Sequence, residues 1–481
     1  MSLESKVFKS VSWLALFSVL GQGVSWAATI LIAHILVPGD YGLMSMATII
    51  TGYASIFSEL GLGNAIIQRP NINKSELSSV FWFSMGFTSI LALFCFPAAF
   101  LTASIMHEPR VIPLTQTVGF IFILNGLQIV PSSLLRRELD FKSLGFIDMS
   151  CAIISCLAMF AIAKLNGGVW TLIGGYIIRS FLRTIFLFKK GHWRPSFHFN
   201  FKESKPYLSF GIAVALGRSL YYVQEKSDRF FAGRAWKADI LGYYTFALEM
   251  AQIPTDKIVS VINNVSFSAF SKLQNDKEGF NKFYLNINKV TLTIVLPLFI
   301  GGFIVGDDII RLFLNEKWYP IITIFRFLCL SQILTSLNAV NSFVHSAQGR
   351  PQWSLYYNIV SVIVMPISFY IAVKHGLNGI VVPWLSSYLV LSAGWIVISI
   401  RKIGISFSGY CSNVAHPFFA SILMCIAVSL VHRQNYLFFL SGKMHSLLVL
   451  IVSILVGAIF FGGYFWFVDK KFLISLRSLI K

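Results

Sequence analysis

The stretch VSWLALFSVLGQGVSWAATILIAHIL, residues 11–36, decides the class of fold, and the turn VPGDYG, residues 37–42, follows it directly. A membrane-spanning helix needs about 20 mainly apolar residues, whereas the apolar core of a signal peptide has only about 7–15. The quoted run is too long for a signal peptide. It therefore predicts a first transmembrane helix that the mature protein keeps.

The composition of the whole chain agrees with a lipid environment. The 481 residues are 56% hydrophobic and only 12% charged, with a mean hydropathy of +0.71, whereas soluble domains are about 45–50% apolar and about 25% charged. The six cysteines lie in or beside apolar runs, without a CxxC pair or a Cys/His cluster. We therefore expect packing cysteines, with neither a disulfide framework nor a metal site.

Apolar runs of similar length recur to the end of the chain. They predict an all-α polytopic membrane protein of about 14 transmembrane helices. The predicted spans are Val11–Leu36, Tyr41–Glu59, Val80–Ile105, Ile112–Leu135, Leu144–Ala163, Val169–Phe188, Tyr207–Ala232, Ile240–Ile262, Phe283–Val305, Ile321–His345, Leu355–Val373, Leu377–Ile400, Ala415–Val431 and Leu447–Phe467.

The net charge of +19 has a topological explanation. With the N-terminus inside, 22 of the 39 Lys and Arg residues fall in cytoplasmic segments and 9 in periplasmic loops. This positive-inside bias predicts a multi-pass protein of the bacterial inner membrane with both termini in the cytoplasm. We therefore expect no nucleic-acid partner.

A short internal echo predicts the domain organisation. Tyr41-Gly42 with Ala47 follows the first span, and Leu241-Gly242-Tyr243 with Ala247 follows the seventh. Transporters are commonly built from such repeats, with the substrate site at their interface. We predict a six-helix bundle at 1–190, a second at 206–402 and a terminal helix pair at 412–470.

The search for enzyme motifs gives a negative expectation. GxxxxGK[ST], HExxH and GxSxG are absent from the sequence, and every predicted connection is too short to hold a soluble catalytic domain. We expect a protein that is not an enzyme and that has no cofactor.

Charged residues inside the predicted spans are the candidates for function, because each costs at least about 2.5–3.5 kcal/mol at the bilayer centre. Arg218, Tyr222, Glu225 and Arg229 are spaced by 4, 3 and 4 residues, so they share one helical face. Arg218 lies near mid-membrane. Snorkelling or local ion pairs remain alternatives for Asp228 and Arg229 near the helix end.

The next predicted span adds an acidic face. Glu249 and Asp256 lie on it, and Pro254 interrupts the helix. Such a face could bind H⁺ or Na⁺ or act in gating, or Glu249 could pair with a basic residue such as Arg218.

Five other polar positions inside the spans complete the candidates. Arg326 has the planar fork that suits phosphate, and Gln22 marks a polar, close-packed spot in the first span. Arg179 and Arg183 are predicted to snorkel to the cytoplasmic surface. Asp148 is predicted to be structural.

The chain also resembles a known family over most of its length. It is similar to the polysaccharide transporter family, of the colanic-acid and O-antigen type, in the multidrug/oligosaccharidyl-lipid/polysaccharide (MOP) flippase superfamily. The matching segments are Leu36–Gly42, Leu134–Phe141, Gly168–Trp170, Trp193–Pro195, Asp228–Gly242, Ser271–Gln274, Trp318 with Pro320, Arg326 and Gly349–Pro351. One departure is Ser268, where the family pattern has proline.

The resemblance implies a flippase that exports undecaprenyl-pyrophosphate-linked oligosaccharide by alternating access for surface polysaccharide synthesis. From the charged and polar positions inside the spans, we predict Arg218, Arg326, Arg229, Tyr222 and Gln22 as substrate contacts. The implied partners are the lipid-linked substrate and membrane lipid, with polysaccharide polymerase or assembly proteins as further candidates. Coupling to H⁺ or Na⁺ would use Glu249, Asp228, Glu225, Asp256 and Pro254.

Three alternatives stay open at this point. An ion-coupled multidrug exporter or a lipid II flippase of the same superfamily would share the fold. A membrane polysaccharide polymerase or glycosyltransferase would differ in class. Deep arginines favour an anionic head group over a cationic drug, and the short loops disfavour a polymerase.

Overall fold

A computed structural model describes residues 3–59, 61–69, 72–191, 193–273, 276–348, 350, 352–434, 443–470 and 472. These residues form helices and connections without a β-strand. Fourteen helices in the described part of the chain are long, and each coincides with one of the 14 predicted spans. The predicted fold class is therefore confirmed.

The chain divides into two compact units, Met1–Gly242 and Tyr243–Lys481. The first contains α1 (Leu3–Ile35), α2 (Pro38–Glu59), α3 (Leu62–Gln68), α4 (Lys74–Met106), α5 (Val111–Arg137), α6 (Phe141–Lys164), α7 (Trp170–Lys190), α8 (Phe201–Ala235) and the start of α9 (Ala238–Lys272). Here α8 packs against α2, α3 and α4. The predicted bundles at 1–190, 206–402 and 412–470 divide the chain differently and stay a prediction.

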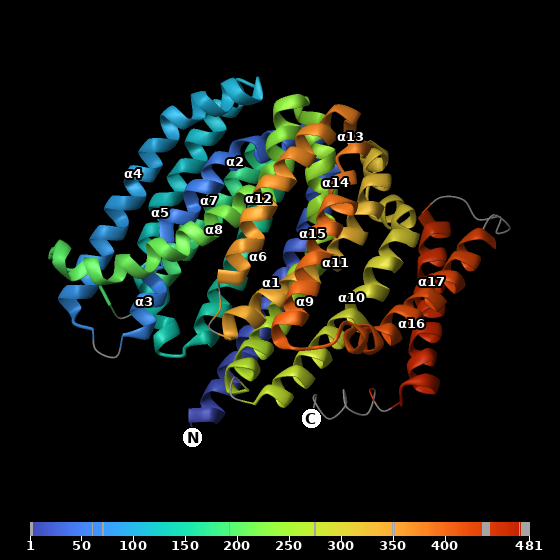
Figure 1. The fold of residues 1–481 in the computed structure, drawn as a ribbon. Coiled ribbons are helices and arrows are strands. Elements are labelled where there is room, and N and C mark those ends of the chain that lie inside the picture. Colours follow the sequence, from blue (N-terminus) through green and yellow to red (C-terminus); the bar gives the residue numbers. More distant parts are fainter. Residues whose placement is uncertain are drawn as a thin grey trace. The chain divides into compact units, whose positions relative to one another are not determined.

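The second unit contains the rest of α9 and the remaining helices. They are α10 (Lys277–Phe313), η1 (Glu316–Ile321), α11 (Ile322–Ala347), α12 (Gln352–Ala372), η2 (Val373–His375), α13 (Gly376–Gly379), α14 (Val382–Leu385), α15 (Ser387–Ile403), α16 (Phe407–Gln434) and α17 (Lys443–Val468). The terminal helices α16 and α17 pack side by side and both contact α10 (Figure 1).

Length and composition make most of these helices suitable for a bilayer. Twelve segments of the described chain are long and apolar enough to cross a membrane. The two other long helices, α8 and α9, have 35 residues each and carry the charged residues singled out above. At about 1.5 Å per residue each is about 52 Å long, which exceeds the roughly 30 Å hydrocarbon core.

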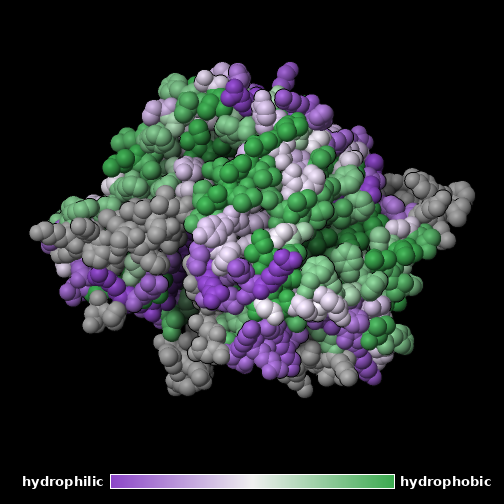
Figure 2. All heavy atoms as spheres, viewed as in Figure 1, coloured by the Kyte–Doolittle hydropathy of each residue, from purple (hydrophilic) through white to green (hydrophobic). Residues whose placement is uncertain are grey.

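Side chains that would be buried in a soluble protein face outward here. Large hydrophobic residues such as Leu93, Phe100 and Leu157 are more than half exposed, and hydrophobic residues cover much of the surface in view (Figure 2). Such a surface contacts a membrane or another protein, and the twelve long apolar segments favour the membrane. The chain is therefore a multi-pass membrane protein.

Close backbone packing replaces the hydrophobic effect inside the first unit, because lipid tails are as apolar as leucine. A Cβ added to Gly126 of α5 would overlap the hydroxyl of Thr88 on α4, and α4 and α5 run side by side (Figure 1). The two glycines of the sequence echo also meet. A side chain on Gly42 would overlap the carbonyl oxygen of Ala238, and one on Gly242 would overlap that of Pro38.

Candidate functional site: an arginine-lined cavity in the first unit

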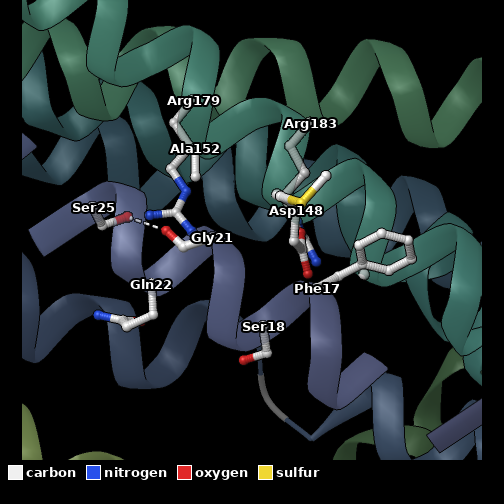
Figure 3. Close-up of a pocket in the computed structure, with 11 residues that line it drawn as sticks. Phe17, Ser18, Gly21, Gln22, Ser25, Asp148, Ala152, Arg179 and Arg183 are labelled. Carbon is white, nitrogen blue, oxygen red and sulfur yellow. Dashed lines mark hydrogen bonds and ion pairs between the residues drawn. The ribbon is translucent and has the colours of Figure 1, made fainter. Parts of the chain in front are cut away.

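A cavity of about 460 Å³ lies between α1, α6 and α7 of the first unit. Its polar lining is Ser18, Gln22 and Ser25 from α1, Asp148 from α6, and Arg179 and Arg183 from α7. Figure 3 shows the α7 arginines reaching down from one side and Gln22 and Ser18 on the other. The cavity therefore joins residues that are more than 150 positions apart in the sequence.

The two arginines lie deep in α7. They are four residues apart, so both point from one face of the helix. Arg179 is about 14 Å along the axis from Trp170 and about 17 Å from Lys190, at about 1.5 Å per residue. Arg179 is therefore close to the middle of the span, whereas Arg183 is about 10 Å from Lys190. The predicted snorkelling of the two residues stays a prediction. The cavity surrounds the two guanidinium groups with polar side chains, so their side chains need not extend to the membrane surface.

Arg183 is held by two partners on different helices. Its Nε donates to Asp148 Oδ1 at 2.7 Å, and one Nη donates to Gln128 Oε1 of α5 at 2.6 Å. The Gln128 amide in turn donates to the Ser180 hydroxyl at 3.0 Å and to the Thr184 hydroxyl at 3.0 Å. This network fixes the guanidinium between α5, α6 and α7, because each partner is itself positioned.

Arg179 differs from Arg183 in its contacts. Its side chain is exposed to the cavity, and no hydrogen bond or ion pair joins it to a residue in the described part of the chain. A guanidinium in this position has five N–H donors and no acceptor. It is therefore available to a ligand that supplies acceptor oxygens.

A second, smaller cavity lies next to the first. It has about 220 Å³ and is lined mainly by amides, hydroxyls and glycines: Ser58, Gly61, Gly63, Asn64, Asn125, Gln128, Ser132 and Ser133, with Ile129, Arg136 and Arg183. Arg183 lines both cavities. The two cavities therefore share Arg183, which Asp148 and Gln128 hold in place.

The charge of the larger cavity is positive. It contains two arginines against one aspartate, in a membrane environment where the effective dielectric constant is low. Among the described residues there is also no group of three or more His, Cys, Asp or Glu side chains that could hold a metal ion. The arrangement suits the binding of an organic anion.

The residues predicted from sequence on α8 lie mostly elsewhere. Tyr222 donates its hydroxyl to the carbonyl oxygen of Ile49 on α2 at 2.8 Å, which joins α8 to α2. Glu225 pairs with the adjacent Lys226 at 2.6 Å. Arg218 has an exposed side chain and Arg229 a half-buried one. Only Gln22 of the five predicted substrate contacts lines the arginine-containing cavity.

The predicted coupling residues are similarly dispersed. Asp228 is fully buried, and its Oδ1 accepts from the backbone N–H of Arg229 at 2.6 Å. Glu249 and Asp256 of α9 are exposed, and Pro254 lies inside that continuous helix.

Arg326 lies in the second unit, on α11. Its Nε donates to the carbonyl oxygen of Phe303 on α10 at 2.7 Å, and its guanidinium carbon lies 5.0 Å from the centre of the Phe303 ring. These contacts hold α11 against α10. A role of Arg326 in substrate binding stays a prediction.

Sequence reasoning therefore missed Arg179, Arg183 and Asp148 as parts of one cavity. A signal was present, because Arg179 is nine residues from Trp170 in a span of about 20 residues. The signal for Asn125 and Gln128 was weaker, since amides inside membrane helices commonly serve packing. Only the packing of α1, α5, α6 and α7 brings these residues together.

Comparison with known proteins identifies the family. The model of the family described as "Polysaccharide biosynthesis protein" matches residues 31–323, more than half of the chain. The chain belongs to this family. The resemblance predicted from the sequence is thus confirmed.

Relatives from two distant bacteria support the same assignment. The chain is 26% identical over 433 residues to the lipopolysaccharide biosynthesis protein WzxC of Escherichia coli, covering 88% of this chain and 87% of that protein. It is 23% identical over 416 residues to the teichuronic acid biosynthesis protein TuaB of Bacillus subtilis, covering 85% and 84%.

Solved structures agree on the fold. The lipid II flippase MurJ, in its inward closed conformation, has a TM-score of 0.76 with 15% identity, covering 97% of this chain and 99% of that chain. An inward-facing multidrug resistance MATE family transporter of the MOP superfamily has a TM-score of 0.58 with 17% identity, covering 81% and 94%. Both likenesses concern the fold alone.

Proposed function

We propose that this protein is a flippase that moves undecaprenyl-pyrophosphate-linked oligosaccharide across the bacterial inner membrane by alternating access, for surface polysaccharide synthesis. Its family, its relatives in lipopolysaccharide and teichuronic acid biosynthesis and its MurJ-like fold all support this function. A further relative, ExoT of Rhizobium meliloti, is described as a succinoglycan biosynthesis transport protein. Both termini are proposed to be cytoplasmic, and no catalytic role is assigned to the chain.

The observation that carries the proposal is the arginine-lined cavity among the membrane helices of the first unit. A pyrophosphate cannot cross hydrocarbon unaided, because its charges would lose water without compensation. Arg179 and Arg183 offer charge-assisted hydrogen bonds in its place. A drug exporter for cations would need the opposite sign in this cavity, so the arginines also argue against that alternative.

Reconstituted vesicles test the function directly. Purified protein in liposomes with undecaprenyl-pyrophosphate-linked oligosaccharide on one leaflet is expected to move it to the other leaflet. Arg179→Ala is expected to slow this movement about 10-fold or more, since a charged hydrogen bond contributes about 1.5–3 kcal/mol. Lys164→Ala removes the same charge from an exposed position at the end of α6 and serves as the control. Absence of movement by the parent protein would contradict the proposed function, whereas equal rates for all three proteins would remove the role of Arg179 in it.

The candidates from sequence are kept as further proposed contacts. Arg218 and Arg326 are to be replaced by Ala and by Lys, with membrane levels checked, and surface polysaccharide and inner-leaflet precursor measured. Normal export in both Ala variants would remove them. Glu249→Gln and Asp228→Asn test ion coupling, because a carrier residue is expected to lose gradient-stimulated movement when its charge is removed.

A further inference from the structure

We infer that the two cavities of the first unit divide the substrate head group between them, with pyrophosphate in the larger cavity and the first sugar in the smaller one. This inference rests on the proposed function and adds the place and chemistry of sugar recognition. It makes Asn64 and Asn125 determinants of sugar binding, and it makes Arg183 the boundary between the two subsites.

The two linings differ in their share of neutral hydrogen-bonding groups. The larger cavity presents Arg179 and Arg183, which only donate, beside Asp148, Gln22 and two serines. Phosphate oxygens only accept at neutral pH, so they match these groups. The smaller cavity presents three side-chain amides and three hydroxyls, which both donate and accept, beside Arg136 and Arg183. Sugar hydroxyls and acetamido groups do the same, so a carbohydrate matches the smaller lining.

Some of these polar groups still have capacity for a ligand. Asn125 Oδ1 accepts a weak hydrogen bond from the Ser180 hydroxyl at 3.3 Å, and no described residue accepts from its amide nitrogen. Asn64 has an exposed side chain that makes no hydrogen bond to the described part of the chain. Gln128, in contrast, is committed to Arg183, Ser180 and Thr184. We therefore assign sugar contact to the asparagines and a positioning role to Gln128.

Size and connectivity fit the division. The larger cavity, at about 460 Å³, falls in the range of about 300–1,000 Å³ that is usual for small-molecule sites. The smaller, at about 220 Å³, is below that range and suits a single sugar ring. The first sugar is bonded directly to the pyrophosphate, so its subsite must adjoin the phosphate subsite. Arg183 lines both cavities, which meets that requirement.

Binding measurements on the full-length protein in nanodiscs test the inference. The probes are inorganic pyrophosphate, undecaprenyl pyrophosphate without sugar, and undecaprenyl-pyrophosphate-linked N-acetylglucosamine and glucose. Asn64→Ala/Asn125→Ala is expected to bind inorganic pyrophosphate within 2-fold of the parent. The same variant is expected to lose about 5-fold or more of the preference for a sugar-bearing over a sugar-free lipid.

Matched variants separate the two subsites. Arg179→Ala is expected to weaken inorganic pyrophosphate about 10-fold and to keep the sugar preference. Asn73→Ala removes an exposed amide at the start of α4, outside both cavities, and is expected to match the parent. Asn64→Ala alone, at a side chain that holds no described contact, is expected to give part of the effect without loss of folding.

Two results would overturn the inference. One is an unchanged sugar preference in the double asparagine variant. The other is a loss of pyrophosphate binding in that variant, or in Arg136→Ala, as large as in Arg179→Ala. The vesicle assay distinguishes failure of this inference from failure of the proposed function. If the parent protein moves the lipid-linked oligosaccharide but the asparagine variants keep the preference for a sugar-bearing lipid, only the assignment of the two subsites is refuted.

Discussion

Each unit contains a cluster of polar side chains among apolar helices, but the two clusters differ in charge and in use. In the first unit Arg179 has no partner in the described chain and faces a cavity. In the second unit the Asn338 amide donates to the Tyr357, Tyr388 and Ser392 hydroxyls, which joins α11 to α12 and α15. Neutral groups that bond one another hold helices together, whereas a charged donor facing a cavity can bind a ligand.

The second cluster extends further along α11 and α15 and includes Thr255 of α9. His345 Nε2 lies 2.9 Å from the Ser399 hydroxyl oxygen, and the Thr255 hydroxyl donates to Gln332 at 3.0 Å. All four of these residues are buried. The comparison teaches that the number of polar residues in a membrane helix does not identify a site. The sign of the charge and the partners already engaged are more informative.

The largest expected effect comes from removing Arg183. Arg183→Ala leaves Asp148 without its ion-pair partner, and breaking a buried pair costs about 3–5 kcal/mol. Because the Asp148 side chain is 44% exposed, we expect a smaller loss of stability, together with at least a 10-fold loss of transport. The double variant Arg183→Ala/Asp148→Ala is expected to restore the amount of protein in the membrane but not the transport rate. Restored transport in the double variant would show that Arg183 serves only the fold.

An intermediate effect is expected from the second cluster. Asn338→Ala removes three hydrogen bonds, and such bonds in membrane proteins average about 0.6 kcal/mol each. We therefore expect about 1–2 kcal/mol of lost stability, measured by unfolding in detergent, and transport per folded protein within 2-fold of the parent. If transport fell with stability unchanged, the contrast between the two clusters would break down.

The smallest effect is expected from an ion pair in water. Arg110 donates to both oxygens of Glu108, each at 2.8 Å, in the turn between α4 and α5. The hydrogen bond from Arg110 holds the pKa of Glu108 below its ordinary value of 4.5. Because the folded-state pKa is lowered, the pair stabilises the protein above the ordinary pKa, and this contribution is lost as the pH falls through the lowered value.

The thermal midpoint measures this contribution. Arg110→Ala is expected to lower the midpoint slightly at pH 7, since exposed pairs contribute about 0–1 kcal/mol. The difference from the parent should shrink as the pH falls below 4.5, the ordinary pKa of the Glu108 side chain. A difference that grew on acidification would have the wrong sign for this pair.

The sequence by itself determined the membrane fold and the family. Fourteen apolar segments predicted the 14 long helices, because each spanning helix must carry about 20 apolar residues regardless of its neighbours. Gln22, for which the sequence favoured a packing role, lines the larger cavity, and its role as a substrate contact stays a prediction. The echo at Gly42 and Gly242 could be read from the sequence too, since glycine is needed where backbones approach closely.

Only the tertiary structure decided which charged residues share a cavity. The sequence favoured α8, where charges are dense, yet Glu225 pairs with its neighbour and Tyr222 bonds to α2. Arg179 and Arg183 became candidates because the packing of α1, α6 and α7 leaves a space beside them. Periodicity specifies the face on which a side chain lies. Whether that face meets lipid, a partner or a cavity depends on helices that are distant in sequence.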